Sequence, residues 1–327
     1  MKRLVLGLVA LVACSPGALD VKAMNFVSWT RPKDAGVPTA YALRVLDDRV
    51  YVRTADALES YRLNGGTPIF EKLVFVKDAS ANPAIPNFMA AKPGLVVFGD
   101  GSRVILVDVP AMTQIGELDL GSANVGELHF DGDWLYIGLY ADGVKRVNLA
   151  TPTAPGALET ITTLDAYRLL VGTQHLYLAN SGAIQIVTKE PNATELGSAY
   201  TGRLGELALY QGRWLYGSIG PARELAVIDV LDPAAPRVVK SGDDQSNGTG
   251  LALVGNQLLA TDLEGRLQVF ELADPERPVL QGTLSMLDDT GARAACGTTC
   301  SGATFGMATS GNLVMIGGLS GFAVFRR

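Results

Sequence analysis

One pattern recurs through most of the chain: an apolar strand, a turn, a strand such as Leu-Tyr-Ile, a glycine turn and another apolar strand. Seven copies of its second strand can be aligned, and their central residues are Tyr51, Val96, Tyr136, Tyr177, Tyr216, Leu259 and Val314. Successive central residues lie 45, 40, 41, 39, 43 and 55 residues apart, and a four-stranded propeller blade needs about 40 to 50. The repeat therefore predicts an all-β chain that folds as a β-propeller of seven four-stranded blades.

Composition and turns fit short strands better than helices. Hydrophobic residues make up 48% of the 327 residues, charged residues 18%, and there are 37 glycines, which suits buried strands joined by tight turns. Turns such as Asp100-Gly101 separate the predicted second and third strands, where short hairpins need a positive φ. Three of the third strands end in a Pro-x-x-Pro turn, whose second proline is tolerated because it begins an edge strand.

The third strands also carry a resemblance to a known repeat family. Residues 225–230 read Leu-Ala-Val-Ile-Asp-Val and are followed by Asp-Pro-Ala-Ala-Pro, which resembles the LVIVD repeat. Residues 104–109 and 267–272 are similar to it, and two weaker copies have Asn148 or Thr188 in place of the aspartate. The resemblance covers roughly residues 40–327, implies a surface β-propeller, and carries no catalytic residues.

The predicted ring needs a closing strand, because the last copy of the repeat lacks an outer strand. We expect the segment near residues 24–28 to supply it, which would remove an exposed edge. The expected domain organisation is therefore a single propeller over residues 22–327.

The N-terminus has the features of an export signal. Met1-Lys2-Arg3 is basic, residues 4–13 are apolar, and the run is too short to span a bilayer. Leu-Val-Ala followed by Cys14 resembles the lipobox of bacterial lipoproteins, which implies removal of residues 1–13, lipid attachment at Cys14 and a tether over residues 14–21. Ser15 resembles the residue that sorts lipoproteins to the outer membrane, so we expect a lipid-anchored envelope protein of a Gram-negative bacterium. An ordinary signal peptide is the alternative.

The remaining cysteines, Cys296 and Cys300, lie in the sequence Cys-Gly-Thr-Thr-Cys. In an oxidising compartment we expect a small disulfide between them. A metal site would need two further ligands, and His129 and His175 are the only histidines, so no metal is predicted.

Charge and motifs exclude several functions. Lys and Arg number 27 against 33 Asp and Glu, so no basic footprint for nucleic acid exists. The sequence contains no Gly-x-Ser-x-Gly, His-Glu-x-x-His or phosphate-binding loop motif. We therefore expect neither a catalytic residue nor a cofactor.

Five residues are candidates for binding. Glu127 and Glu206 begin inner strands in similar contexts and would line the channel as paired carboxylates only if a bulge absorbs a one-residue shift between them; otherwise we expect solvated glutamates. His129 follows on the first of these strands, either facing the channel or as a structural histidine. Asp243 and Asp244 begin a stretch that lacks two ligands of a calcium loop and is expected to be a polar loop.

The longest connections, residues 74–85, 241–248 and 283–302, all lead into inner strands and should gather on one face. Variable loops on a rigid scaffold are common recognition surfaces. The sequence thus favours a non-enzymatic, envelope-anchored propeller that binds or scaffolds another envelope protein or an extracellular polymer through this loop-rich face. The alternatives are a channel-centred, metal-assisted hydrolase or lyase acting on a glycan or lactone, and, less favoured, a quinone or redox propeller.

Overall fold

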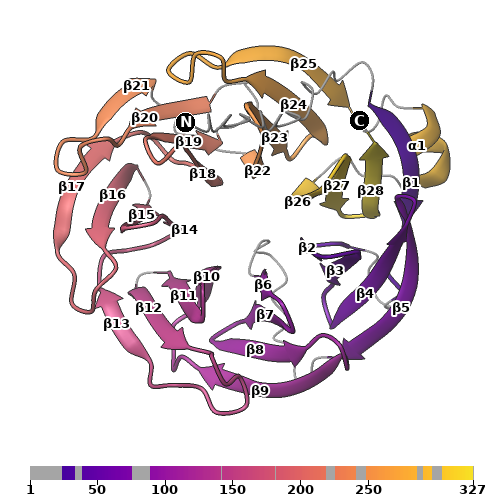
Figure 1. Ribbon diagram of the computed structural model, residues 1–327, viewed down its shortest axis with the longest axis horizontal. Coiled ribbons are helices and arrows are strands. Elements are labelled where there is room, and N and C mark those ends of the chain that lie inside the picture. Colours follow the sequence, from indigo (N-terminus) through magenta and orange to yellow (C-terminus); the bar gives the residue numbers. More distant parts are fainter. Residues whose placement is uncertain are drawn as a thin grey trace, which may run out of the picture.

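The computed structural model describes residues 24–33, 39–75, 89–140, 142–180, 182–218, 225–240, 248–285, 290–296 and 304–326. The predicted signal peptide and tether, including Cys14, lie outside these residues, as do Asp243, Asp244 and Cys300. In the described part, seven antiparallel sheets of four strands each stand around a central axis (Figure 1). The predicted architecture of seven four-stranded blades is confirmed.

Strands are named here blade by blade, from the inner strand outward. Blade 1 contains β2 (Ala42–Leu46), β3 (Arg49–Arg53), β4 (Ala57–Asn64) and β5 (Thr67–Phe75). Blade 2 contains β6 (Met89–Lys92), β7 (Leu95–Asp100), β8 (Arg103–Asp108) and β9 (Thr113–Asp119). Blade 3 contains β10 (Val125–Asp131), β11 (Trp134–Leu139), β12 (Gly143–Asn148) and β13 (Glu159–Thr162). Blade 4 contains β14 (Arg168–Val171), β15 (His175–Ala179), β16 (Ala183–Thr188) and β17 (Glu195–Tyr200).

Blade 5 contains β18 (Leu207–Tyr210), β19 (Trp214–Ser218), β20 (Leu225–Asp229) and β21 (Arg237–Lys240). Blade 6 contains β22 (Gly248–Val254), β23 (Gln257–Asp262), β24 (Arg266–Glu271) and β25 (Val279–Ser285). Blade 7 contains β26 (Thr304–Ser310), β27 (Leu313–Gly318), β28 (Gly321–Arg326) and, as its outer strand, β1 (Asn25–Thr30). The third strands predicted at residues 104–109, 225–230 and 267–272 agree with β8, β20 and β24 to within one residue, and the central residue of each predicted second strand lies in the observed one.

Blade 7 closes the ring by joining the two ends of the described chain. β1 pairs antiparallel with β28, so that Phe26 lies opposite Phe325 and Thr30 opposite Phe322. The indole nitrogen of Trp29 donates a hydrogen bond of 3.0 Å to the carbonyl oxygen of Ser320. The N-terminal segment therefore supplies the missing outer strand, as predicted, and extends to Thr30.

The hydrophobic core is itself a ring. Seven clusters of buried side chains each fill the space between two neighbouring blades. In the cluster that joins blade 7 to blade 1, Met315 and Val324 pack with Leu43 and Val52. Each fully buried aliphatic side chain contributes about 1.5–3 kcal/mol. Stability is thus concentrated between the blades, which leaves the central axis free for polar side chains.

Aromatic residues of the repeat belong to these clusters. The tyrosines of the second strands, including Tyr136 and Tyr216, are buried. Trp134 packs against the cluster between blades 3 and 4, and Trp214 lies in the one between blades 5 and 6. Both tryptophans therefore pack between blades.

The connection over residues 283–302 differs from the irregular loop that the sequence predicted. Its first three residues extend β25, and Thr290–Cys296 form a short helix, α1, on the outside of β1 (Figure 1). The alanines of Thr-Gly-Ala-Arg-Ala-Ala-Cys are strong helix formers, which accounts for the difference. Cys296 is buried and disulfide-bonded, and its carbonyl oxygen accepts a hydrogen bond of 2.6 Å from Arg31 Nη2. Among the described residues, no helix is long and apolar enough to cross a membrane.

Candidate functional site

Three charged residues occupy the same position of the repeat in three successive blades. In each of these blades, the second strand contains a buried tyrosine, and the charged residue of the inner strand lies opposite the residue two positions after that tyrosine. Glu127 lies opposite Gly138, Arg168 opposite Ala179 and Glu206 opposite Ser218. The three charged side chains therefore begin at one height of the channel, in blades 3, 4 and 5.

The one-residue shift that the sequence showed between Glu127 and Glu206 is absorbed in a hairpin and not in a bulge. In blade 3, two residues separate Asp131 of β10 from its partner Trp134 of β11. In blade 5, the hairpin between Tyr210 of β18 and its partner Trp214 of β19 is one residue longer. The two glutamates consequently occupy equivalent positions.

Glu127 joins blade 3 to blade 4. Its carboxylate is buried, accepts a hydrogen bond of 3.0 Å at Oε2 from the Leu169 amide, and lies 3.3 Å at Oε1 from His129 Nε2. Burial alone would raise the pKa of Glu127, but His129, Arg168 and the Leu169 amide together hold this pKa below its usual value. Glu127 is therefore ionised at neutral pH.

Arg168 continues this chain of contacts from blade 4 to blade 5. Its Nε donates to the Gly205 carbonyl oxygen, while Nη1 is buried and has no hydrogen-bond partner in the described part of the chain. Burial would lower the pKa of the guanidinium, but Glu127 and Glu206 keep it above its usual value. Arg168 is thus a permanent buried cation with an unused donor.

Glu206 holds a proton at neutral pH. Removal from water, the neighbouring charge of Glu127 and a hydrogen bond between the two carboxyl groups raise the pKa of Glu206 to about 8, against the opposing effect of Arg168 and Arg44. Two close carboxyl groups cannot both ionise cheaply, so the pair shares one proton. The pair carries a single negative charge below about pH 8.

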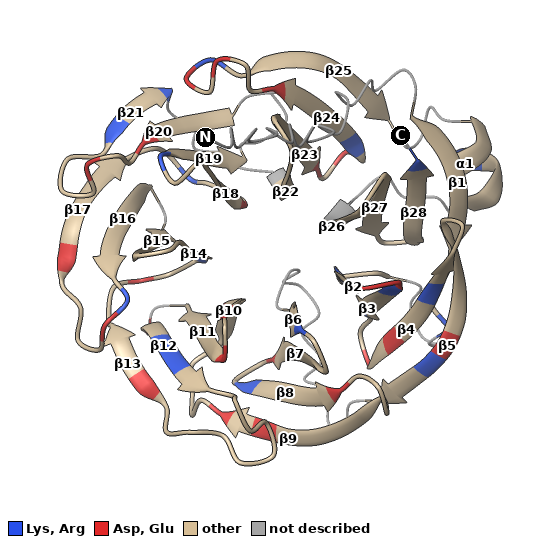
Figure 2. Ribbon diagram, viewed as in Figure 1, with Lys and Arg blue, Asp and Glu red and all other residues tan. Residues whose placement is uncertain are grey.

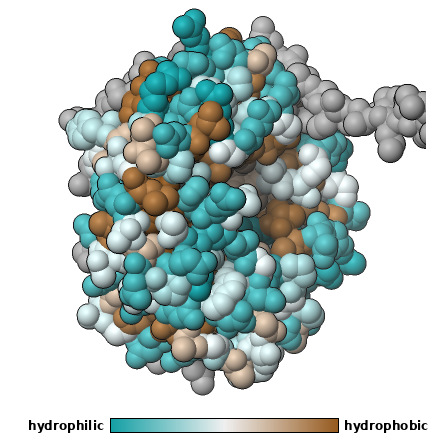
Figure 3. All heavy atoms as spheres, turned by 60° about the vertical axis from the view of Figure 1, so that its left-hand side comes forward, coloured by the Kyte–Doolittle hydropathy of each residue, from teal (hydrophilic) through white to brown (hydrophobic). Residues whose placement is uncertain are grey.

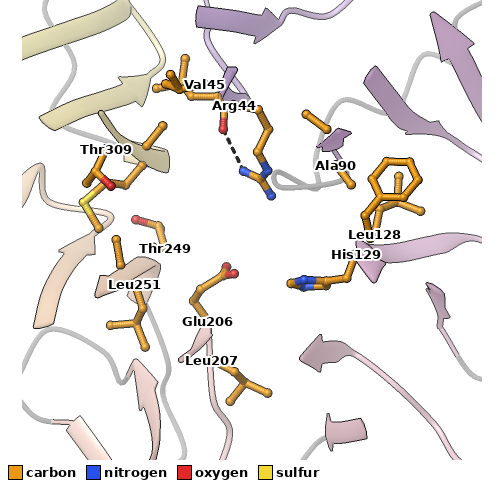
Figure 4. A pocket seen from close by; sticks show the side chains of 17 residues that line it. Arg44, Val45, Ala90, Leu128, His129, Glu206, Leu207, Thr249, Leu251 and Thr309 are labelled. Carbon is orange, nitrogen blue, oxygen red and sulfur yellow. Dashed lines mark hydrogen bonds between the residues drawn. The ribbon is translucent and has the colours of Figure 1, made fainter. Parts of the chain in front are cut away.

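Arg44 faces this pair from blade 1. Arg44 lies opposite Tyr51 in blade 1, just as His129 lies opposite Tyr136 in blade 3. Its Nη1 donates a hydrogen bond of 2.8 Å to the carbonyl oxygen of the neighbouring Leu43. Burial lowers the pKa of the Arg44 guanidinium, and the charges of Glu206 and Glu127 oppose this effect. Figure 4 shows the Arg44, His129 and Glu206 side chains pointing toward one another from three blades.

These side chains border a central cavity of about 450 Å³. Among the described residues, blade 2 contributes the small side chains of Ala90 and Ala91 to this lining. A second cavity of about 430 Å³ shares Leu207, Leu251 and Ala252 with the first and extends along blades 4 to 6. Figure 3 shows hydrophobic surface gathered in a hollow at its right-hand side. Concave cavities on which a few polar groups converge are typical ligand sites.

The charge of the cluster has a definite sign. Arg44 and Arg168 contribute two positive charges, and the Glu127–Glu206 pair contributes one negative charge while it holds its proton. Among the described residues, this cluster therefore carries one excess positive charge, before His129 is counted. The outer strands differ from one another: β9, β13 and β17 carry acidic residues alone, β21 carries basic residues alone, and β5 carries both (Figure 2).

The structure brings together Glu127, His129 and Glu206 among the sequence candidates. Sequence reasoning missed Arg44 and Arg168, because it considered carboxylates and histidines alone. The signal was available: Arg168 aligns with Glu127 in the repeat, and Arg44 aligns with His129.

The other candidates do not join this cluster in the described residues. Asp243, Asp244, Cys14 and Cys300 lie outside them. The described residues contain no group of three His, Cys, Asp or Glu side chains placed to hold a metal ion.

Comparison with known proteins agrees with this architecture. No model of a known protein family and no curated protein matches the chain. The β-propeller domain of Cps50 (Swd1) from Myceliophteria thermophila is similar in structure, with a TM-score of 0.66 and 12% identity over 93% of this chain and 99% of that domain. The computationally designed protein Ika8 is similar with a TM-score of 0.58 and 13% identity, over 90% of this chain and 98% of that one. At such identities the likeness is one of fold, and in fold this chain is a seven-bladed β-propeller.

Proposed function

We propose that this chain is a non-enzymatic binding propeller, held at the cell envelope through lipid on Cys14, whose central channel takes a small organic anion. The observation that carries the proposal is the convergence of Arg44, His129 and Glu206 on an open cavity whose charge cluster has one excess positive charge (Figure 4). An uncompensated buried charge is costly. A bound anion would balance it.

One donor and one nearby charge support an anion more specifically. The Arg44 guanidinium lines the cavity, and within the described residues its one side-chain hydrogen bond goes to Leu43. The buried Arg168 guanidinium does not line the cavity but adds a positive charge that interacts with Glu206. Guanidinium groups bind carboxylates through parallel hydrogen bonds, which makes an organic acid a suitable ligand.

The proposed localisation and the proposed macromolecular partner are supported by the sequence. The lipobox-like Leu-Val-Ala-Cys supports anchoring at an outer membrane, and the resemblance to LVIVD repeats supports a role at the surface. An envelope protein or an extracellular polymer would meet the loop-rich face, where the inner strands begin. The anion site lies inside the ring and is compatible with such a contact.

The two histidines make a direct test possible, because His129 lies in the cavity and His175 begins β15 outside it. Acetate, methylammonium and sulfate would be titrated into the soluble chain that starts after Cys14, with the imidazole signals followed by NMR. We expect saturable shifts of the His129 signals with acetate, none with methylammonium, and an unchanged His175.

Arg44→Met should weaken acetate binding at least tenfold, while Arg44→Lys should retain part of it. The matched control is Arg62→Met, since Arg62 is a half-exposed arginine outside the channel that pairs with Glu71 at 3.4 Å. Acetate shifts that persist in Arg44→Met, or a preference for methylammonium, would contradict an anion site.

A further inference from the structure

Resting on the proposed function, we infer that the ligand is a monocarboxylate with an apolar chain: its carboxylate binds at Arg44, and its chain lies in a groove across blades 4 to 6. This leucine groove is lined by the side chains of Leu170, Leu207, Leu209, Leu251 and Leu253.

The leucine groove begins where the charged part of the channel ends. Leu207 directly follows Glu206, and Leu207 and Leu251 line both the central cavity and the groove. Leu170, Leu209 and Leu253 are only partly buried. The cavity that Arg44 lines therefore passes by Leu207 and Leu251 into the groove, where an attached hydrocarbon chain would cover the exposed parts of these leucines.

The remaining walls offer few polar side chains. The groove is otherwise lined by Val171, Ala208 and Ala252, together with the hairpin residues Gly172, Thr173 and Gly212. Threonine is the one side chain among these with a hydrogen-bonding group. A hydrocarbon chain can therefore pack against the aliphatic side chains without leaving a polar group of its own unpaired.

The charge of the head group is limited to one. Arg44 and Arg168 exceed the Glu127–Glu206 pair by a single positive charge, so a carboxylate balances the cluster. A phosphate dianion would add a net negative charge beside the ionised Glu127. The geometry therefore selects a monoanion over a doubly charged head group, and selects both over an amine.

Chain-length dependence tests the inference. The affinities of acetate, butanoate, hexanoate and octanoate would be measured by calorimetry at pH 7 and below micelle-forming concentrations. We expect the dissociation constant to fall about fourfold for each added methylene, the ratio that corresponds to burying one CH₂. Octylammonium and 1-octanol should bind at least tenfold more weakly than octanoate.

Variants separate the groove from the anion site. Leu209→Ala should weaken octanoate about tenfold and leave acetate unchanged, and Leu253→Ala provides an independent second truncation. Leu196→Ala is the matched control, because Leu196 is an exposed leucine on the outer strand β17. Thermal unfolding of each variant confirms that it is folded at the temperature of the titration.

The outcomes distinguish the two proposals. Acetate binding without any gain from a longer chain would overturn the leucine groove and leave the anion site intact. Equal binding of octanoate, octylammonium and octanol would support the groove and overturn charge recognition. No binding of any member of the series would overturn both.

Discussion

The Glu127 carboxylate of blade 3 accepts a hydrogen bond of 3.0 Å from the Leu169 amide of blade 4. Leu169 also belongs to the hydrophobic cluster between these blades. The Glu127 side chain thus links the charged cluster of the channel to the hydrophobic packing between blades 3 and 4. Substitutions in the channel should therefore change the stability of the whole propeller.

Replacement of Glu127 by alanine should lower the free energy of unfolding by about 1–3 kcal/mol, because it leaves the Leu169 amide unpaired. Urea denaturation measures this loss. Glu190→Ala is the control, since the Glu190 side chain is 80% exposed, and it should change stability by no more than about 0.5 kcal/mol. Equal effects of the two variants would show that the buried carboxylate has no special role.

Stability should fall as the pH rises toward 8. The pKa of Glu206 is raised to about 8 in the folded chain from an ordinary value of 4.5. Its contribution is fully present below pH 4.5 and is lost as the pH rises through 8, at most about 1.4 kcal/mol per pH unit. Glu206→Gln keeps a hydrogen-bond donor without the titration, so its urea midpoint should decline less between pH 5 and 8. A parallel decline in both proteins would refute this origin.

The affinity of the channel for acetate should also depend on the protonation of Glu206. Ionisation of Glu206 gives the carboxyl pair a second negative charge beside Arg44, so acetate should bind more weakly above pH 8, by up to about tenfold per pH unit. The groups around Glu206 are Arg44, Glu127, His129 and Arg168. Calorimetry at pH 7, 8 and 9 measures the effect. Glu206→Gln should abolish the decline over this range, and a decline that survives in this variant would point to another group.

Two glycines with nearly the same backbone separate strain from crowding. Gly143 has φ +80° and Gly94 has φ +82°, but an added Cβ would lie 2.0 Å from the Thr162 carbonyl oxygen at Gly143 and would meet nothing within 4 Å at Gly94. Gly94→Ala should cost about 1–2 kcal/mol, the strain of a left-handed residue. Gly143→Ala should cost more than about 3 kcal/mol, because the outer strand β13 must move. Similar midpoints in thermal or urea unfolding would mean that the backbone yields easily.

The fold could be predicted from the sequence because its elements repeat. A tyrosine or aliphatic residue at each central position fixes the second strand, and glycine turns such as Asp100-Gly101 fix its neighbours. Closure by β1 followed from the same logic, since the final repeat lacks one strand. Helix α1 was missed because it belongs to no repeat and its alanines stand within a glycine- and threonine-rich connection.

The site could be predicted only in part. Glu127, His129 and Glu206 stand out as polar residues on apolar inner strands, but their relative height depends on the length of the hairpin after Tyr210. Arg44 belongs to blade 1 and meets them only across the closed ring (Figure 4). No local pattern connects residues so far apart in the chain, so the charge balance and the cavity needed the structure.

The pairing of β1 with β28 has a consequence for the order of assembly. Trp29 and Ser320 are 291 residues apart in the chain, and their hydrogen bond belongs to the contacts that close the circle. During synthesis β1 is made well before β28, so this pairing cannot form until the growing chain has reached β28. The circle thus closes in one late, long-range step, and until then the nascent protein is an open arc with two unfinished ends.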